Sequence, residues 1–179
     1  MDPDTELGAT RAALAAEHAA VYGYGVAGAA AGSDLDPDLR QAWSGHRSRR
    51  DALTRRIRDL GGEPPAAAAG YALPFEVTDG PSALALAAEL ETRLAAVYAD
   101  LVRFSAGDAR REAAIALREA AVLAARWHGR AVAFPGVSEY ATPTDPSEQP
   151  DDDRGTGKMT GAHPPAGPGT VPGAGFGQD

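Results

Sequence analysis

The stretch Leu14–Gly25, LAAEHAAVYGYG, places a glutamate and a histidine inside an apolar, helix-forming segment. In a helix, Glu17 shares one face with the apolar residues Leu14, Val21 and Tyr24. His18 lies about 100° further round the helix, near the edge of that face. A buried charge is costly unless it is paired, hydrogen-bonded or bound to a metal. Glu17 therefore predicts a polar site inside a helical protein.

The composition favours a helical domain with a core of small residues. Of the 179 residues, 44% are hydrophobic but only 6% are aromatic, so the core must consist mainly of Ala, Leu and Val. Alanine-rich surfaces suit closely packed helices better than sheets. The length is sufficient for one domain with a single core.

Charge and cysteine content exclude several classes of function. The formal net charge of −8 argues against a nucleic-acid-binding protein and against binding to anionic membranes. The absence of cysteine excludes disulfides, thiolate metal sites and cysteine nucleophiles. The acidic start MDPDTELG does not resemble a signal peptide, and no run of 18 uncharged apolar residues follows it. We therefore expect a cytoplasmic protein.

Four segments carry a helical period, at about residues 4–31, 36–60, 80–105 and 108–134. Asp-Pro pairs at residues 2–3 and 36–37 and the run Asp79–Pro81 predict the starts of the first three. Gly61 predicts the end of the second, and Pro135 the end of the fourth.

The lengths of the connections predict the topology. The first and second helices, and the third and fourth, are separated by only a few residues, which predicts two antiparallel hairpins. The segment 61–80 is far longer, and its apolar part 71–75 is expected to pack along the bundle. Two hairpins joined by one long crossover between helices two and three form the ferritin-like four-helix topology. We expect this bundle to span residues 1–135.

Residues 136–179 differ in character from the rest of the chain. They are rich in proline and glycine and contain the acidic run Asp151–Asp153. Such a segment buries too little apolar surface to offset the entropy of ordering it. We expect a disordered tail that could bind an unknown protein partner, or act only as a solubilising extension.

By the same helical periodicity, the other three predicted helices also direct polar side chains inward. Glu91 shares a face with Leu84, Leu94, Tyr98 and Leu101, and His46 shares one with Trp43, Leu53, Ile57 and Leu60. On the fourth helix, Glu119 aligns with Ile115, Val122 and Arg126. Three carboxylates and one histidine, one from each helix, are therefore predicted to meet in the core.

The motif EHAAVYGYG at residues 17–25 and the helical pattern over about residues 4–134 resemble the ferritin-like superfamily. The likeness is greater to bacterial ferritin-like domains of unknown function. Di-iron members of the superfamily take a glutamate from each of two helices and a Glu-x-x-His pair from each of the other two. By this resemblance, Glu17 and Glu91 match the two single glutamates.

The two Glu-x-x-His positions depart from that pattern. If His46 takes the glutamate position of helix two, Arg49 stands where the histidine belongs; if it takes the histidine position, Trp43 replaces the glutamate. On helix four Glu119 is kept, but Val122 replaces the histidine. Each pair therefore keeps at most one ligand, which disfavours an intact di-iron centre.

Two functional hypotheses remain. In the preferred one, Arg49 pairs with the inward carboxylates, no metal is needed, and the domain is non-catalytic or weakly metal-binding, with a structural or interaction role and a possible homodimer. In the alternative, Glu17, His46, Glu91 and Glu119 bind one iron, manganese or zinc ion in an oxidoreductase or iron-handling protein.

The tyrosines and the arginine-rich segment are also open to two interpretations. Tyr22, Tyr24 and Tyr98 could be redox-active or gating phenols, but such tyrosines more often pack with their hydroxyls at a wet edge. The arginines of residues 46–60 could form a phosphate-binding face, but intrahelical pairs with Asp51 and Asp59 fit an acidic protein better.

Overall fold

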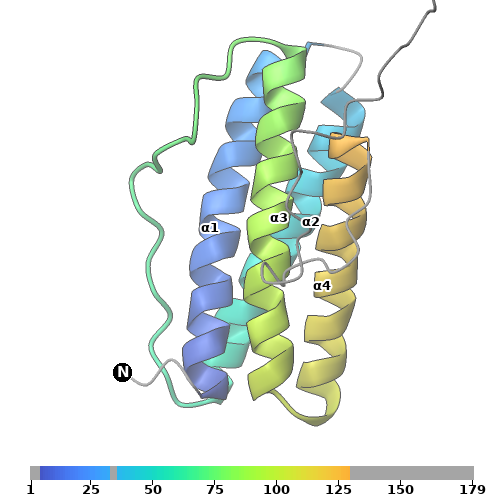
Figure 1. Ribbon diagram of the computed structural model, residues 1–179. Coiled ribbons are helices and arrows are strands. Elements are labelled where there is room, and N and C mark those ends of the chain that lie inside the picture. Colours follow the sequence, from blue (N-terminus) through green and yellow to red (C-terminus); the bar gives the residue numbers. More distant parts are fainter. Residues whose placement is uncertain (1–4, 33–35, 130–179) are drawn as a thin grey trace, which may run out of the picture. The chain divides into compact units, whose positions relative to one another are not determined.

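The computed structural model describes residues 5–32 and 36–129. These residues form four helices and no strand, as the sequence predicts (Figure 1). The helices are α1 (Glu6–Ala30), α2 (Asp36–Asp59), α3 (Gly80–Phe104) and α4 (Gly107–His128). The predicted tail and its boundary at residue 135 lie outside the described residues.

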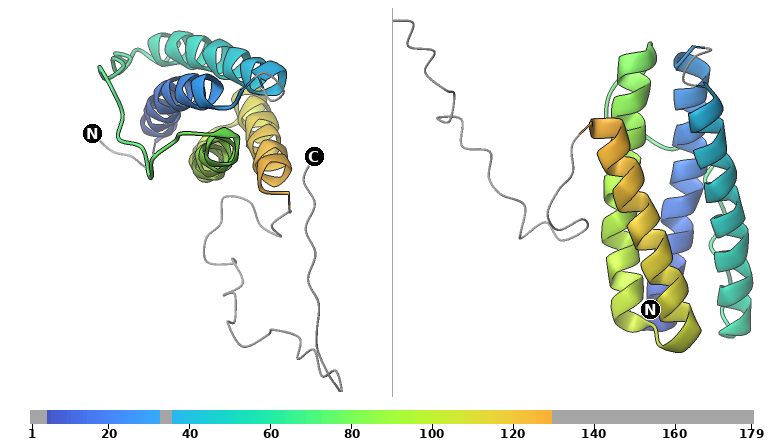
Figure 2. Two further views of the ribbon diagram at one scale, coloured as in Figure 1. Left: turned by 90° about the horizontal axis from the view of Figure 1, so that it is seen from above. Right: turned by 90° about the vertical axis from the view of Figure 1, so that its right-hand side faces the viewer.

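The helices form a bundle with one long crossover, which confirms the predicted topology. The chain runs up α1 and down α2, returns along the outside of the bundle through residues 60–79, and then runs down α3 and up α4 (Figure 1). Helix α1 packs on α2 and α3, and α3 packs on α4. The view from above shows α2, α1 and α3 in succession, with α4 beside α3 (Figure 2).

Side-chain caps mark the starts of α1 and α3. Thr5 caps α1 by accepting a 3.1 Å hydrogen bond from the Gly8 amide. The predicted start signal at residues 2–3 lies outside the described residues. Asp79 forms a capping box with Ser82 at the start of α3, where the sequence predicts that the helix begins.

The end of α4 differs from the predicted position near Phe134. Gly129 has a φ of 70°, a left-handed conformation that commonly ends a helix, and α4 stops at His128. Residues 130–134 lie outside the described part of the chain.

The crossover is attached to the outer face of α1. The backbone carbonyl of Glu63 accepts a 3.0 Å hydrogen bond from the Arg11 guanidinium. The carbonyl of Pro65 lies 3.3 Å from Nε2 of His18. Tyr71 packs on Tyr22 with a ring separation of 5.6 Å. The predicted packing of the apolar segment 71–75 along the bundle is confirmed through Leu73, although Phe75 remains exposed.

The core consists of two apolar clusters with buried polar residues between them. One cluster contains Leu94, Leu101 and alanines of α1, α3 and α4, and the other contains Leu39, Leu86 and alanines of α1, α2 and α3. Alanine lets helices approach closely, so the bundle is narrow and offers little room for a charged side chain without a partner.

The buried face of α4 is not the predicted one. Ala113, Ala116, Ala120 and Ala124 face the core, whereas Ile115 and Val122 are exposed. The alanines pack closely against α3, and this contact outweighs the larger transfer free energy that Ile115 and Val122 would gain by burial. Glu119 therefore lies at the edge of the bundle and not inside it.

None of the helices in residues 5–32 and 36–129 combines the length and the apolar character that a membrane span requires.

Two glycines of α1 provide a matched test of the packing between α1 and α3. A methyl group on Gly25 would contact nothing within 4 Å, so we expect Gly25→Ala to raise the free energy of unfolding by about 0.5–1 kcal/mol through helix propensity. A methyl group on Gly23 would lie 2.6 Å from Leu90 Cδ1. Because Leu90 must move, Gly23→Ala should be less stable than Gly25→Ala in urea unfolding. Equal stabilisation by both substitutions would contradict this packing.

Candidate functional site

Three helices each place one fully buried polar side chain at the same point of the core. Glu17 of α1, His46 of α2 and Glu91 of α3 are each 0% exposed. These are three of the four residues that the sequence predicts to meet. Their positions on the core-facing stripes of their helices are confirmed.

His46 lies between the two carboxylates. Its Nδ1 is 2.9 Å from Glu17 Oε2, and its Nε2 is 3.0 Å from Glu91 Oε1. A neutral imidazole has only one N–H, whereas an imidazolium donates from both nitrogens. Two ionised carboxylates facing the two nitrogens therefore favour the doubly protonated ring.

The pKa of His46 follows from the same contacts. Burial alone would lower it, but the hydrogen bonds to Glu17 and Glu91 and the charges of these carboxylates raise the pKa from 6.5 to about 9. His46 is therefore a cation at neutral pH. The buried group consists of one imidazolium between two carboxylates and carries a net charge of −1.

Two tyrosines bind the carboxylates from the other side. The Tyr24 hydroxyl of α1 donates to Glu91 Oε1, and the Tyr98 hydroxyl of α3 donates to Glu17 Oε1, each at 2.5 Å. Burial, reinforced by the neighbouring carboxylate, raises the pKa of both phenols. Both therefore remain donors. The sequence suggested that these hydroxyls lie at a wet edge. They do not, because each has a buried carboxylate as its partner.

Helix α4 joins this group through a tryptophan. Trp127 Nε1 donates to the Tyr24 hydroxyl at 3.0 Å. The result is one chain of hydrogen bonds that links all four helices, in the order Trp127, Tyr24, Glu91, His46, Glu17 and Tyr98. Buried hydrogen-bond networks of this kind fix the relative positions of the elements that supply them.

Glu119, the fourth predicted residue, does not join the group. It forms an ion pair with Arg49 of α2, and its side chain is 44% exposed. The sequence-based expectation that Arg49 pairs with a carboxylate is confirmed, but that carboxylate is Glu119, while His46 neutralises the two buried ones. Arg49 Nη1 also lies 3.5 Å from His46 Nδ1.

The pKa of Arg49 reflects its position between the core and the surface. Burial lowers it, but the hydrogen bond to Glu119 and the charge of Glu17 raise it above the ordinary value. Arg49 therefore brings a permanent positive charge to the edge of the buried group. This charge offsets the net −1 of the imidazolium and its two carboxylates.

The donor set does not fit a metal ion as it is arranged. Both nitrogens of His46 face carboxylates, and a ligating imidazole must offer a lone pair from one of them. Within residues 5–32 and 36–129, no group of three or more His, Cys, Asp or Glu side chains has a geometry that could hold a metal. The ligand role of Glu17, His46, Glu91 and Glu119 therefore stays a prediction.

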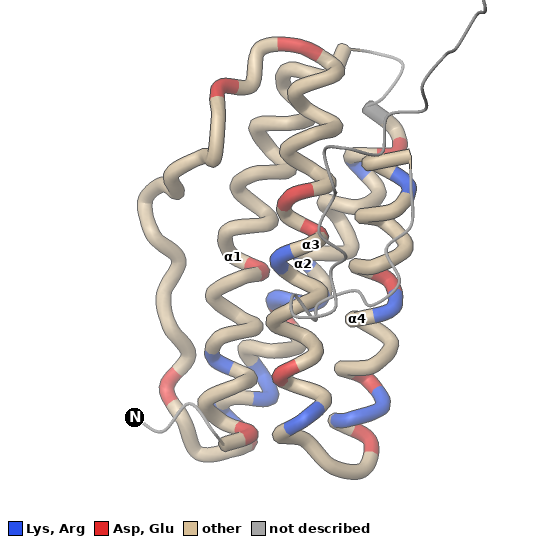
Figure 3. Tube along the Cα trace, in the orientation of Figure 1, with Lys and Arg blue, Asp and Glu red and all other residues tan. Residues whose placement is uncertain are grey.

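Several other charged residues form ion pairs on the surface of the bundle. Arg50 binds Asp51 at 2.7 Å, as the sequence predicts, and Arg126 of α4 binds Asp38 of α2 at 2.5 Å. Basic and acidic residues lie close together along the helices (Figure 3). This mixture supports a solvated surface and not a phosphate-binding face.

Removing the Tyr24 hydroxyl tests the hydrogen-bond chain. Tyr24→Phe leaves a Glu91 oxygen and the Trp127 N–H each short of a partner, and we expect a loss of about 1–3 kcal/mol in the free energy of unfolding. Tyr22→Phe is the matched control, because Tyr22 is 39% exposed and should change stability by less than about 0.5 kcal/mol. Similar losses for the two variants in urea unfolding would contradict the assignment.

The raised pKa of His46 predicts how stability depends on pH. Because the folded-state pKa is above the unfolded value, the contribution of His46 is complete below about pH 6.5 and is lost as the pH rises to about 9. The full contribution is about 3 kcal/mol. Urea unfolding over this range should show falling stability for the native chain and for His18→Gln, and a smaller fall for His46→Gln. A rise in stability over the same range would contradict the imidazolium.

Comparison with known proteins gives a family but no activity. Residues 9–139 match the domain of unknown function DUF4439. A crystal structure of a conserved hypothetical protein, rv2844, from Mycobacterium tuberculosis is similar, with a TM-score of 0.68 and 35% sequence identity over 72% of this chain and 98% of that chain. No curated protein matches. The family match covers most of the chain, and the protein therefore belongs to the DUF4439 family.

Proposed function

We propose that this domain is a ferritin-like bundle in which the His46 imidazolium replaces the metal, and that it acts as a non-catalytic binding module. The topology supports this proposal, because two hairpins joined by one long crossover are typical of ferritin-like folds. Glu17 and Glu91 come from two different helices, like the single glutamates of the di-iron members.

One observation carries the proposal: each ring nitrogen of His46 is hydrogen-bonded to a different buried carboxylate. A metal between two carboxylates neutralises their charge, and the imidazolium does the same with a proton on each nitrogen. A metal that took its place would have to remove at least one proton from His46 and displace the ring. Arg49, 3.5 Å from Nδ1, would repel that metal as well.

The other polar groups bonded in this network are committed to structure. The phenols of Tyr24 and Tyr98 donate to the carboxylates, and the carboxylates accept from His46. Groups held in this way fix the arrangement of the helices and leave the surface of the bundle for binding. The structural role is also consistent with the narrow alanine-rich core, where an unpaired Glu17 or Glu91 would be strongly destabilising.

One observation favours the alternative, a metal-dependent oxidoreductase or iron-handling protein. Glu91 Oε2 is buried and has no hydrogen-bond partner among the described residues. If His46 lost a proton and turned, this oxygen could bind iron or manganese together with Glu17. Loading the purified protein with metal ions distinguishes the two proposed functions.

The experiment compares metal content and melting temperature of the purified protein before and after anaerobic loading with Fe²⁺, Mn²⁺ and Zn²⁺. We expect no stoichiometric binding and no rise in melting temperature. The double variant Glu17→Ala, Glu91→Ala should lose about 3–5 kcal/mol of stability, because it leaves His46 without its buried partners.

The matched control is Glu63→Ala, Glu76→Ala, which removes two exposed carboxylates and should leave stability nearly unchanged. One metal ion per chain, with a rise in melting temperature that only the Glu17 and Glu91 variant loses, would establish the alternative function.

A further inference from the structure

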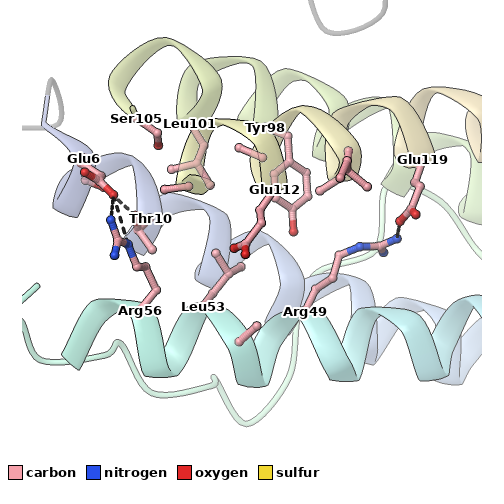
Figure 4. Close-up of a pocket in the computed structure, with 15 residues that line it drawn as sticks. Glu6, Thr10, Arg49, Leu53, Arg56, Tyr98, Leu101, Ser105, Glu112 and Glu119 are labelled. Carbon is pink, nitrogen blue, oxygen red and sulfur yellow. Dashed lines mark hydrogen bonds and ion pairs between the residues drawn. The ribbon is translucent and has the colours of Figure 1, made fainter. Parts of the chain in front are cut away.

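A cavity of about 300 Å³ lies between α2 and α4, beside the buried hydrogen-bond chain (Figure 4). Its volume is at the lower end of the range of small-molecule sites and equals about ten water molecules at ~30 Å³ each. The walls come from all four helices and are largely apolar, with Ala52, Leu53, Tyr98, Leu101, Ala113 and Ile115 among them. A short hydrocarbon chain lying there would therefore be partly removed from water.

The charges around the cavity do not balance. Arg56 pairs with Glu6 at one end, and Arg49 pairs with Glu119 at the other. Between these two pairs, the carboxylate of Glu112 is directed across the cavity towards Leu53 (Figure 4). In the described part of the chain Glu112 forms no hydrogen bond or ion pair. Glu112 is solvent-exposed, so the cavity has one uncompensated negative charge at its open side, above an apolar floor.

A second polar group in the wall also has no partner. Ser105 is 2% exposed, and its hydroxyl oxygen has no hydrogen-bond partner within the described residues. It lines the end of the cavity near Glu6 (Figure 4). Buried polar groups in folded proteins normally have partners. The cavity therefore presents two polar groups without partners in the described residues, the Glu112 carboxylate and the Ser105 hydroxyl, in otherwise largely apolar walls.

We propose that the cavity between α2 and α4 binds a small organic cation, an alkylammonium whose charged end pairs with Glu112 and whose hydrocarbon chain lies against Leu53 and Leu101. The inference deepens the proposed function, since it names the class of ligand for the binding module. The ammonium group supplies the charge that the two ion pairs leave uncompensated. The apolar walls favour a chain over a fully hydrated ion such as Na⁺.

The experiment measures binding of n-octylamine, n-octanol and n-octanoate to the full chain by calorimetry and by the shift in melting temperature, below the micellar concentration of each probe. We expect octylamine to bind about tenfold or more tightly than octanoate, with octanol between them. Added salt should weaken the binding of octylamine more than that of octanol.

Three variants make the test specific. Glu112→Gln keeps the shape of the side chain and should weaken octylamine binding by about tenfold without affecting octanol. Glu76→Gln makes the same charge change on the exposed crossover and should have no effect. Ala52→Phe places a ring into the cavity from an exposed position and should abolish binding of all three probes while the protein stays folded.

Equal binding of octylamine and octanoate, no effect of Glu112→Gln, or no binding of any probe would overturn the proposal. The result is independent of the metal experiment, because none of these variants changes His46, Glu17 or Glu91. A metal-binding core with a working cavity would refute only the proposed function, and a metal-free core with an inert cavity would refute only this inference.

Discussion

The fold depends on burying two carboxylates in a narrow bundle. Glu17 and Glu91 come from helices that pack against each other, and each carboxylate is fully removed from water. Two such charges are tolerated only with a cation between them. His46 supplies that cation from α2, and its two ring nitrogens are spaced so that one imidazolium serves both carboxylates. Di-iron bundles meet the same electrostatic requirement with metal ions.

Several other features follow from this arrangement. Each carboxylate still needs donors after His46 has bound it, and Tyr24 and Tyr98 provide them reciprocally between α1 and α3. Trp127 then connects α4 to the same network. The alanine face of α4 packs on α3, and Glu112, Ala113 and Ile115 of the same helix line the cavity. The buried polar group and the proposed ligand site are therefore two consequences of one mode of helix packing.

The sequence predicted the helices, the long crossover and three of the four inward polar residues, because apolar periodicity and turn signals are local. It did not predict the buried face of α4. There Ala113, Ala116 and Ala120 compete with Ile115 and Val122 for the core, and only the fit against α3 decides between them. The sequence does contain a signal for the tyrosine donors: Tyr24 follows Glu17, and Tyr98 follows Glu91, by the same seven residues, or two helical turns. The protonation of His46 depends on three helices at once, so no single segment of sequence could reveal it.

The most direct test of this account is a nitrogen NMR spectrum of the protein with ¹⁵N-labelled histidine at neutral pH, with His46 assigned by His46→Gln. The account predicts that Nδ1 and Nε2 of His46 both carry a proton, and that the pair titrates near pH 9. A neutral His46 ring at neutral pH, with one nitrogen unprotonated, would contradict it, because that nitrogen would then be available to bind a metal.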